Sequence, residues 1–298
     1  MTNDQYLRNV LSQQRLTSEE LDELRAHRAD VQTVLEDHFS ESNPDIRYAG
    51  SYKKKTMIRD AYDLDVACYF AHEDTAAGQN LREIYDACAE ALAESYHVQR
   101  KRSALRVMEK GALVSRTDFR IDVVPGRYTN DERSDAFLHQ EGGGKTRLKT
   151  NLQVHVEHIR DSGVRDAIKL LKLWRFQRSI QIKTFLLELL AVDLLKYRKA
   201  ATLSTQFRHV LTECRDHPDG LHVEDPANSN NDLKPLMDEA RSDLAAWASL
   251  TLGHIENDDW ESVFGKLPEG AKTESAIAVA IGQAASRTSP SRPWLPTK

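Results

Sequence analysis

One stretch, from Ala49 to Phe70 (AGSYKKKTMIRDAYDLDVACYF), limits the folds open to this chain more than any other. Its apolar second half predicts a strand, in which residues i and i+2 point to the same face. Asp63 and Asp65 then share one face, while Leu64 and Val66 share the other. Two carboxylates side by side repel each other unless a positive group lies between them, and a hard divalent cation such as Mg²⁺ prefers such oxygen ligands.

Gly50 and Ser51 precede these aspartates by about a dozen residues. A Gly-Ser turn lets the backbone come close to a ligand, and the N–H groups freed there can hold a phosphate. Taken alone, an Asp-x-Asp pair is usually an exposed strand end and a Gly-Ser pair is usually a turn. Their order and spacing, with three lysines and Thr56 between them, favour a site for nucleotide chemistry.

A third carboxylate comes from the segment TDFRIDVV, residues 117–124, which alternates as a second strand. The alternation places Asp118 and Asp122 on one face, and a neighbouring strand can bring such a residue beside Asp63 and Asp65. We take Asp122 as the third metal ligand and Asp118 as the alternative. The structural alternative for Asp122 is a surface acid paired with Arg120. Pro125-Gly126 is expected to end this strand.

Composition excludes several classes of protein. The net charge is −5 and the pI is about 6.1, which does not favour tight, nonspecific binding to DNA. The three cysteines are scattered, at Cys68, Cys88 and Cys214, so neither a disulfide framework nor a zinc-bearing DNA-binding insertion is indicated. No apolar run reaches the ~18 residues of a membrane span. We therefore expect a cytoplasmic protein in a reducing compartment, without a membrane anchor.

A P-loop hydrolase is a rival interpretation, because Gly144-Lys145-Thr146 mimics the end of a phosphate-binding P-loop. The complete motif needs another glycine five residues before Gly144, where this chain has His139. It also needs a preceding apolar strand. We therefore predict that Gly142 to Gly144 form a loop without this role.

The order Gly-Ser and then Asp-hydrophobic-Asp resembles the nucleotidyltransferase superfamily of DNA polymerase β. The closer resemblance is to the bacterial cyclic GMP-AMP synthase-like enzymes, the CD-NTases of anti-phage CBASS systems. Their pattern is similar to Gly50-Ser51-Tyr52, Thr56 and then DLDV in this chain. IDVVPG resembles the family's element for the third carboxylate, and TNLQVH resembles a Thr-Asn-Pro-x-x-His segment in which Leu152 replaces the proline.

The resemblance assigns roles to particular residues. It implies two Mg²⁺ or Mn²⁺ ions, one held by Asp63, Asp65 and Asp122 and the other by Asp63 and Asp65. It implies that Gly50, Ser51 and Lys172, in LLKLW, contact the triphosphate, and that Thr184 donates to a phosphate. The alternative for the basic residues of the 164–178 helix is an exposed face, which we favour for Arg165. Glu188 is expected to be structural.

We predict an α+β fold, in which a polymerase-β-like nucleotidyltransferase core with a mixed sheet carries a helical C-terminal lobe. The predicted parts are an N-terminal helical segment, 1–45, that bridges the lobes, the core, 46–150, a helical lobe, 151–285, that completes the nucleotide cleft, and a flexible tail, 286–298. A helix is expected at about 274–286. Residues 126–150 are polar and rich in glycine.

The predicted function is metal-dependent joining of nucleoside triphosphates, with ATP among them, into a cyclic di- or trinucleotide second messenger for anti-phage defence. Pyrophosphate is released. Regulatory proteins and a downstream effector that responds to the product are implied by the resemblance. The alternatives are a linear oligonucleotide or RNA-tailing enzyme of the same superfamily, which predicts an extended basic face, and a non-catalytic binding module, which predicts a missing carboxylate.

Overall fold

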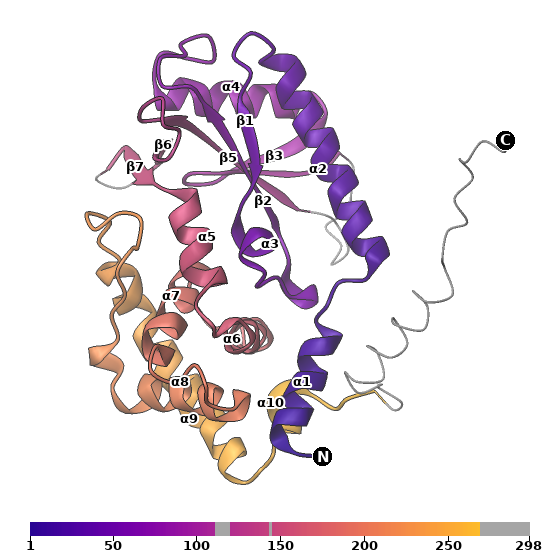
Figure 1. Cartoon of the computed structure of the whole chain (residues 1–298), viewed down its shortest axis with the longest axis vertical. Coiled ribbons are helices and arrows are strands. Elements are labelled where there is room, and N and C mark those ends of the chain that lie inside the picture. The colour runs from indigo at the N-terminus through magenta and orange to yellow at the C-terminus, as the bar shows by residue number, and fades with distance from the viewer. Residues whose placement is uncertain (111–119, 143–144, 269–298) are drawn as a thin grey trace, which may run out of the picture.

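The apolar residues of the chain collect into two large cores, one beside a mixed sheet and one among helices (Figure 1). The computed structural model describes residues 1–110, 120–142 and 145–268. Asp118, Gly144, the helix expected at 274–286 and the tail expected at 286–298 lie outside the described residues. The α+β class with a mixed sheet is confirmed, while the residue limits of the lobes stay a prediction.

The sheet has the strand order β1-β2-β5-β4-β3, with β6 added beside β5 and β7 beside β6. Its strands are β1 (Asp45–Tyr48), β2 (Leu64–Phe70), β3 (Tyr96–Arg100), β4 (Leu105–Glu109), β5 (Ile121–Tyr128), β6 (Ala136–His139) and β7 (Arg147–Thr150). Strands β2 and β5 run parallel and in register, so that Asp65 lies directly beside Asp122. The other pairs are antiparallel.

Strand β2 shows why the sheet has one closed face and one open face. Leu64, Val66, Cys68 and Phe70 are fully buried in the core that also holds α2 (Ser18–His38) and α4 (Leu81–Ala93). These are alternate residues, so they share one face. The intervening residues, Asp65, Ala67 and Tyr69, face the other side, where the helical lobe approaches the sheet.

The helical lobe is built around α7 (Thr184–Leu195), which is apolar on nearly all sides and is therefore a central helix. Around it lie α5 (Leu152–Arg160), α6 (Arg165–Gln177), α8 (Leu203–Asp216), α9 (Lys234–Glu256), α10 (Glu261–Phe264) and two 3₁₀ turns, η1 (Arg59–Ala61) and η2 (Pro218–Gly220). Figure 1 shows this lobe below the sheet, with α3 (Gly50–Lys54) between the two.

The N-terminal segment contacts both cores, but it is not one helix. A capping box at Thr17 starts α2 anew after α1 (Asn3–Gln13) has ended, and α2 stops at His38. Helix α1 packs in the helical core, where the Tyr6 hydroxyl donates to the carbonyl of Gly265 over 2.6 Å. Helix α2 packs beside the sheet.

One prediction about the sheet is wrong. Pro125 and Gly126 lie inside β5 and do not end it, because the strand continues to pair with β6 at Gly126 opposite Leu138. A Cβ at Gly126 would lie 2.7 Å from Leu138 Cδ2, so glycine permits this close pairing. The polar segment 126–150 also contains β6 and β7.

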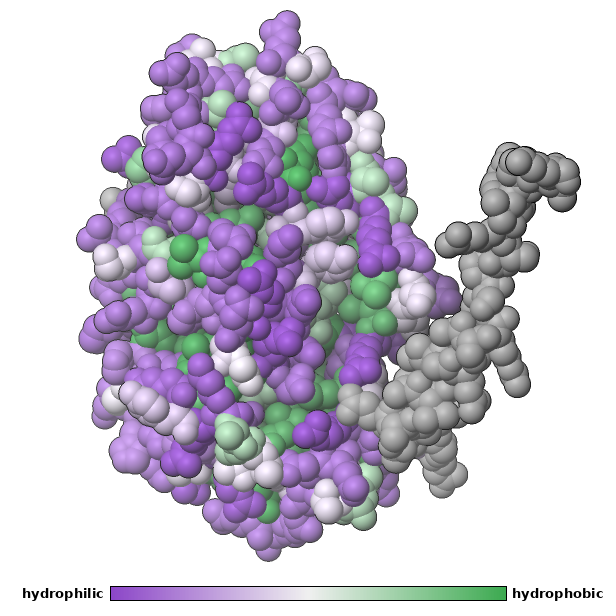
Figure 2. Space-filling model, in the orientation of Figure 1, coloured by the Kyte–Doolittle hydropathy of each residue, from purple (hydrophilic) through white to green (hydrophobic). Residues whose placement is uncertain are grey.

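The surface and the thiols agree with the composition. The face seen in Figure 2 is mostly hydrophilic, and its hydrophobic patches are separate. In the part of the chain that the structure describes, no helix combines the length and the hydrophobicity needed to cross a membrane. The three cysteines are free and buried in the structure.

Candidate active site

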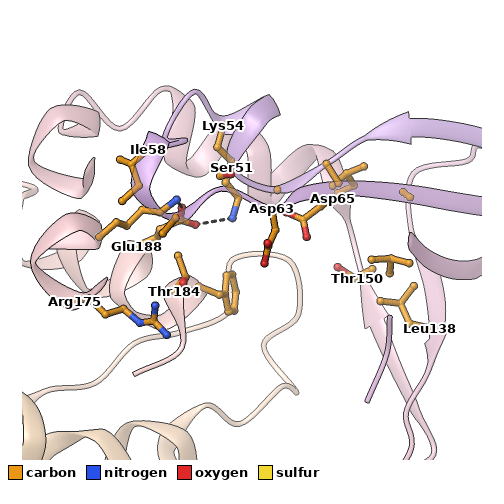
Figure 3. A pocket seen from close by; sticks show the side chains of 18 of the residues that line it. Ser51, Lys54, Ile58, Asp63, Asp65, Leu138, Thr150, Arg175, Thr184 and Glu188 are labelled. Atoms are coloured by element: carbon orange, nitrogen blue, oxygen red, sulfur yellow. Dashed lines mark hydrogen bonds and ion pairs between the residues drawn. The ribbon is translucent and has the colours of Figure 1, made fainter. Parts of the chain in front are cut away.

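A cleft of about 400 Å³ opens between the sheet and the helical lobe, on the open face of β2 (Figure 3). The predicted site residues Gly50, Ser51, Asp63, Asp65, Lys172 and Thr184 all line it. Lys54, Arg175 and Glu188 line it as well. In Figure 3, Asp63 and Asp65 lie close to each other, while Glu188, Arg175 and Thr184 come from the helical side. The structure therefore brings together residues that are far apart in sequence.

Gly50 is placed where no other residue fits. It begins α3, so Gly50 and Ser51 start a short helix and do not form a simple turn. Its φ angle is +52°, which favours glycine, and a Cβ there would overlap the Asp65 carboxylate. The N–H of Ala49 donates to the carbonyl of Asp65 over 2.8 Å. The Gly-Ser segment is thus fixed directly against the acidic strand.

Asp63 and Asp65 line the cleft, whereas Asp122 is not among its lining residues and lies beside Asp65 on the neighbouring strand. Asp65 and Asp122 are register partners in β2 and β5. Asp63 precedes β2, which begins at Leu64, so the strand is one residue shorter than predicted. Burial raises the pKa of Asp65 to about 7, and repulsion from Asp122 and Asp63 adds to this, while Lys54 and Lys172 act in the opposite direction. Asp65 is therefore the carboxylate whose negative charge is least compensated.

Arg106 and Lys101 compensate the negative charges of Asp63 and Asp122, and the sequence did not indicate this role for either residue. Arg106 lies opposite Asp122 in β4, and its Nε donates to Asp122 Oδ1 over 2.8 Å. The same guanidinium forms an ion pair with Asp63. Lys101 Nζ donates to Asp122 Oδ2 over 2.6 Å. Although burial acts to raise it, these hydrogen bonds hold the pKa of Asp122 below its usual value.

The donor chemistry of this cluster fits a hard divalent cation, because it consists of carboxylate oxygens and Asp65 accepts no side-chain hydrogen bond from a described residue. The raised pKa of Asp65 is also the behaviour expected of a buried carboxylate beside two other carboxylates, whose effect exceeds that of Lys54 and Lys172. Within residues 1–110, 120–142 and 145–268, however, no three His, Cys, Asp or Glu side chains are arranged to hold a metal ion. The roles of Asp63, Asp65 and Asp122 as metal ligands stay predictions.

On the helical side, Lys172 is not part of an exposed face. It is 6% exposed, and its Nζ donates to the carbonyl of Thr56 over 2.9 Å. Glu188, on α7, lies 3.4 Å from the same ammonium group and 2.7 Å from Lys54 Nζ. Lys172 lines the cleft, as the predicted contact with a triphosphate requires, but that contact stays a prediction.

Sequence reasoning missed three charged residues around this site, namely Lys54, Lys101 and Arg106, and it expected Glu188 to be structural. Lys54 lies among three consecutive lysines, and only the structure distinguishes it as the buried one. Arg106 alternates with the buried Leu105 and Val107, which indicates a residue on the open face of a strand. That alternation was the one usable signal. Thr184 begins α7 and lines the cleft, as predicted.

The chain is similar to a group of bacterial synthetases. Residues 1–135 match the family described as the Second Messenger Oligonucleotide or Dinucleotide Synthetase domain, SMODS. The chain is 22% identical to the cyclic AMP-AMP-AMP synthase of Escherichia coli strain MS 115-1, over 84% of this chain and 92% of the relative. It is 23% identical to the CBASS oligonucleotide cyclase CdnC of E. coli strain KTE188, over 73% and 80%.

Solved structures show the same fold. The structure of E. coli MS115-1 CdnC in complex with HORMA-deltaN has a TM-score of 0.67 at 19% identity and covers 88% of this chain and 96% of its own. Apo DncV of Vibrio cholerae has a TM-score of 0.69 at 15% identity, with 90% and 96% covered. The Bradyrhizobium diazoefficiens CD-NTase CdnG, in complex with GTP, has a TM-score of 0.66 at 14% identity, with 93% and 98% covered.

Proposed function

The chain belongs to the CD-NTases, and from this premise we propose that it joins nucleoside triphosphates into a cyclic oligonucleotide and releases pyrophosphate. The observation that carries the proposal is the position of Asp65. It lies between Asp122 and the Gly50 backbone, and it lines a cleft that two buried lysines, Lys54 and Lys172, also line. The product serves as a second messenger in CBASS anti-phage defence.

In this site, Asp63, Asp65 and Asp122 would hold two Mg²⁺ or Mn²⁺ ions, which lower the pKa of an acceptor hydroxyl and stabilise the charge of the leaving pyrophosphate. Gly50 keeps the backbone of α3 close to Asp65, and Ser51 lines the same wall. Lys172 and Thr184 bind the triphosphate from the helical side. Arg106 and Lys101 hold the Asp122 side chain beside Asp65. Together these groups orient the reactants, which lowers the entropic part of the barrier.

We propose further that the cyclic product contains two or three nucleotides and that ATP is among the substrates. One similar protein is named a cyclic AMP-AMP-AMP synthase, and a structure of E. coli CdnC was solved with ATP, which supports ATP here. The linear-polymerase alternative is not favoured, since the relatives are named cyclases or cyclic-nucleotide synthases. Ring closure is intramolecular, and such steps reach large effective molarities.

The proposed partners follow from the same comparisons. E. coli CdnC forms a complex with a HORMA protein, which supports a regulatory protein for this chain. We further propose an effector that responds to the product, and a cytoplasmic location. The net charge of −5 supports weak binding to DNA.

The test is to incubate the purified chain with all four nucleoside triphosphates and Mg²⁺ or Mn²⁺ and to separate the products. We expect a short product that resists phosphatase, because a cyclic oligonucleotide has no terminal phosphate. An Asp65→Asn variant serves as the inactive control. A ladder of lengths that grows with time, or complete degradation by phosphatase, would assign the chain to the linear polymerases instead.

A further inference from the structure

Glu188 is a buried acid at the floor of the cleft, and it joins lysines from both lobes. We propose that Glu188 is a positioning residue for the triphosphate: it fixes the ammonium groups of Lys54 and Lys172 in the cleft with N–H donors left for phosphate oxygens. The inference rests on the proposed function and names groups that bind the substrate of the same site.

The geometry shows one carboxylate shared among three partners. Glu188 Oε2 accepts from Lys54 Nζ over 2.7 Å, and Oε1 accepts from the Thr56 hydroxyl over 3.0 Å. Lys172 Nζ lies 3.4 Å from Oε1. Glu188 is 2% exposed and Thr56 is fully buried. The carboxylate therefore has little freedom to move away from either lysine.

The count of donors shows what these lysines can still bind. Each ammonium group has three N–H donors. Lys172 directs donors to Thr56 and Glu188, and Lys54 directs one to Glu188, among the hydrogen bonds of the described residues. One donor therefore remains on Lys172 and two remain on Lys54. Since both lysines line the cleft, these donors are available to phosphate oxygens there.

The charges of the cluster favour an anionic ligand. Two lysines face one glutamate, so the cluster carries one positive charge in excess. Such an excess is costly in a buried place unless a further anion compensates it. Asp65 contributes some compensation, as the effect of both lysines on its pKa shows. The phosphates of a nucleotide would supply the remainder.

The position of the three residues in the fold makes the arrangement specific. Lys54 ends α3, the helix that begins with Gly50 and Ser51, whereas Lys172 and Glu188 belong to α6 and α7 of the helical lobe. Glu188 thus connects the Gly-Ser helix to the opposite wall of the cleft (Figure 3). A purely structural ion pair would stabilise this junction without any effect on the affinity for phosphates.

The test measures binding of inorganic tripolyphosphate by calorimetry, without metal, in wild type, Glu188→Gln, Glu188→Asp and Lys54→Met. Two controls carry the same charge changes at exposed positions of the same helices: Asp193→Asn on α7, which pairs with Lys196, and Lys53→Met on α3. Circular dichroism and thermal melting report folding. The Michaelis constants for the nucleotides and kcat are measured in parallel.

We expect Glu188→Gln and Lys54→Met each to weaken tripolyphosphate binding by about tenfold, and to raise KM more than they lower kcat, as loss of uniform binding does. The double variant should lose less than the product of the two effects, because the residues act through one contact. Glu188→Asp keeps the charge but shortens the reach, so we expect an intermediate effect. The controls should bind like wild type.

The direction in which the affinity for tripolyphosphate changes distinguishes between the possible roles of Glu188. If Glu188 only repels phosphates, Glu188→Gln binds tripolyphosphate more tightly than wild type. If Glu188 has only a structural role, Glu188→Gln binds tripolyphosphate like wild type but has a lower melting temperature. Either result overturns the proposal. If Glu188→Gln does not fold, wild-type-like binding by Glu188→Asp and Lys54→Met overturns it. A wild type that binds tripolyphosphate but makes no cyclic product refutes the proposed function and leaves this inference to be judged by the variants.

Discussion

Two charged clusters, each with residues that line the cleft, have opposite net charges. The acidic cluster holds Asp63, Asp65 and Asp122 with Arg106 and Lys101, so three negative charges meet two positive ones. The basic cluster holds two lysines and one glutamate, Lys54, Lys172 and Glu188. The acidic cluster has one negative charge in excess, and the basic cluster has one positive charge in excess. The comparison indicates that the site is prepared for a ligand with both signs, such as a metal-bound triphosphate.

The largest effect is expected on the acidic side. Asp65→Asn or Asp63→Asn should abolish formation of the product while the fold persists, because loss of a metal ligand costs several kcal/mol of transition-state stabilisation. Product separation together with circular dichroism checks this. Turnover like that of wild type in either variant would end the catalytic interpretation. The same assay on Asp122→Asn and Asp118→Asn identifies the third ligand, and we expect only the Asp122 change to inactivate the enzyme.

The second prediction concerns stability and pH in the absence of metal. The pKa of Asp65 is raised to about 7 from 3.8, so the folded state keeps its proton where the unfolded state has lost it. This contribution to stability is complete below pH ~4 and is lost as the pH rises through ~7. At ~1.4 kcal/mol for each pH unit, its upper limit is ~4 kcal/mol.

Asp65→Asn removes this titration. We therefore expect the variant to be more stable than wild type at pH 8, with a smaller difference at pH 4, in denaturant unfolding with a chelator present. Asp193→Asn, at an exposed position, is the control and should show no such dependence on pH. An equal difference between Asp65→Asn and wild type at both pH values would show that Asp65 is ionised in the folded protein throughout this range.

A smaller effect is expected on the basic side. Lys172→Ala should raise the apparent KM for the nucleotide by about tenfold, and Arg165→Ala should change it little, because Lys172 is buried in the cleft and Arg165 is not among the residues that line it. Steady-state kinetics on both variants gives the answer. Equal effects would mean that the basic residues of α6 act only through their overall field.

The smallest effect is expected from DNA. DNA should neither bind tightly to the chain nor raise its activity, because the net charge is −5 and the three cysteines are isolated in the sequence, without a Cys/His cluster. A mobility-shift assay at two salt concentrations and a product assay with duplex DNA test this. Submicromolar binding that weakens with salt would contradict it and would direct attention to local basic surfaces.

The three carboxylates of the acidic cluster could be predicted from sequence much better than the charged residues that contact them. Alternation placed Asp65 on one face of its strand and Asp122 on one face of another, the resemblance favoured Asp122, and the structure puts the two in register. Arg106 and Lys101 reach Asp122 from 16 and 21 residues away along the chain, through a pairing of strands that local patterns do not specify. The same holds for Glu188, which meets Lys54 across 134 residues.

The errors in the fold have equally local causes. Pro125 and Gly126 carry the signal of a strand end, but the partner strand β6 lies close enough that only a small residue fits there. Strands β6 and β7 are four residues each and lie among polar residues, so their alternation is too brief to be recognised. In the N-terminal segment, the cap at Thr17 marked the start of α2, and the end of α1 before it was overlooked.

The parallel register of β2 and β5 has a consequence for how the enzyme would fail. The separation of Asp65 and Asp122 is set by the spacing of two hydrogen-bonded strands, about 4.8 Å, and therefore by the backbone. A shift of β5 by one residue would turn Asp122 to the face of α4 and bring Ile121 or Val123 into the cleft. Catalytic activity therefore depends on the correct alignment of these strands, and a protein with a misaligned sheet would be folded but inactive.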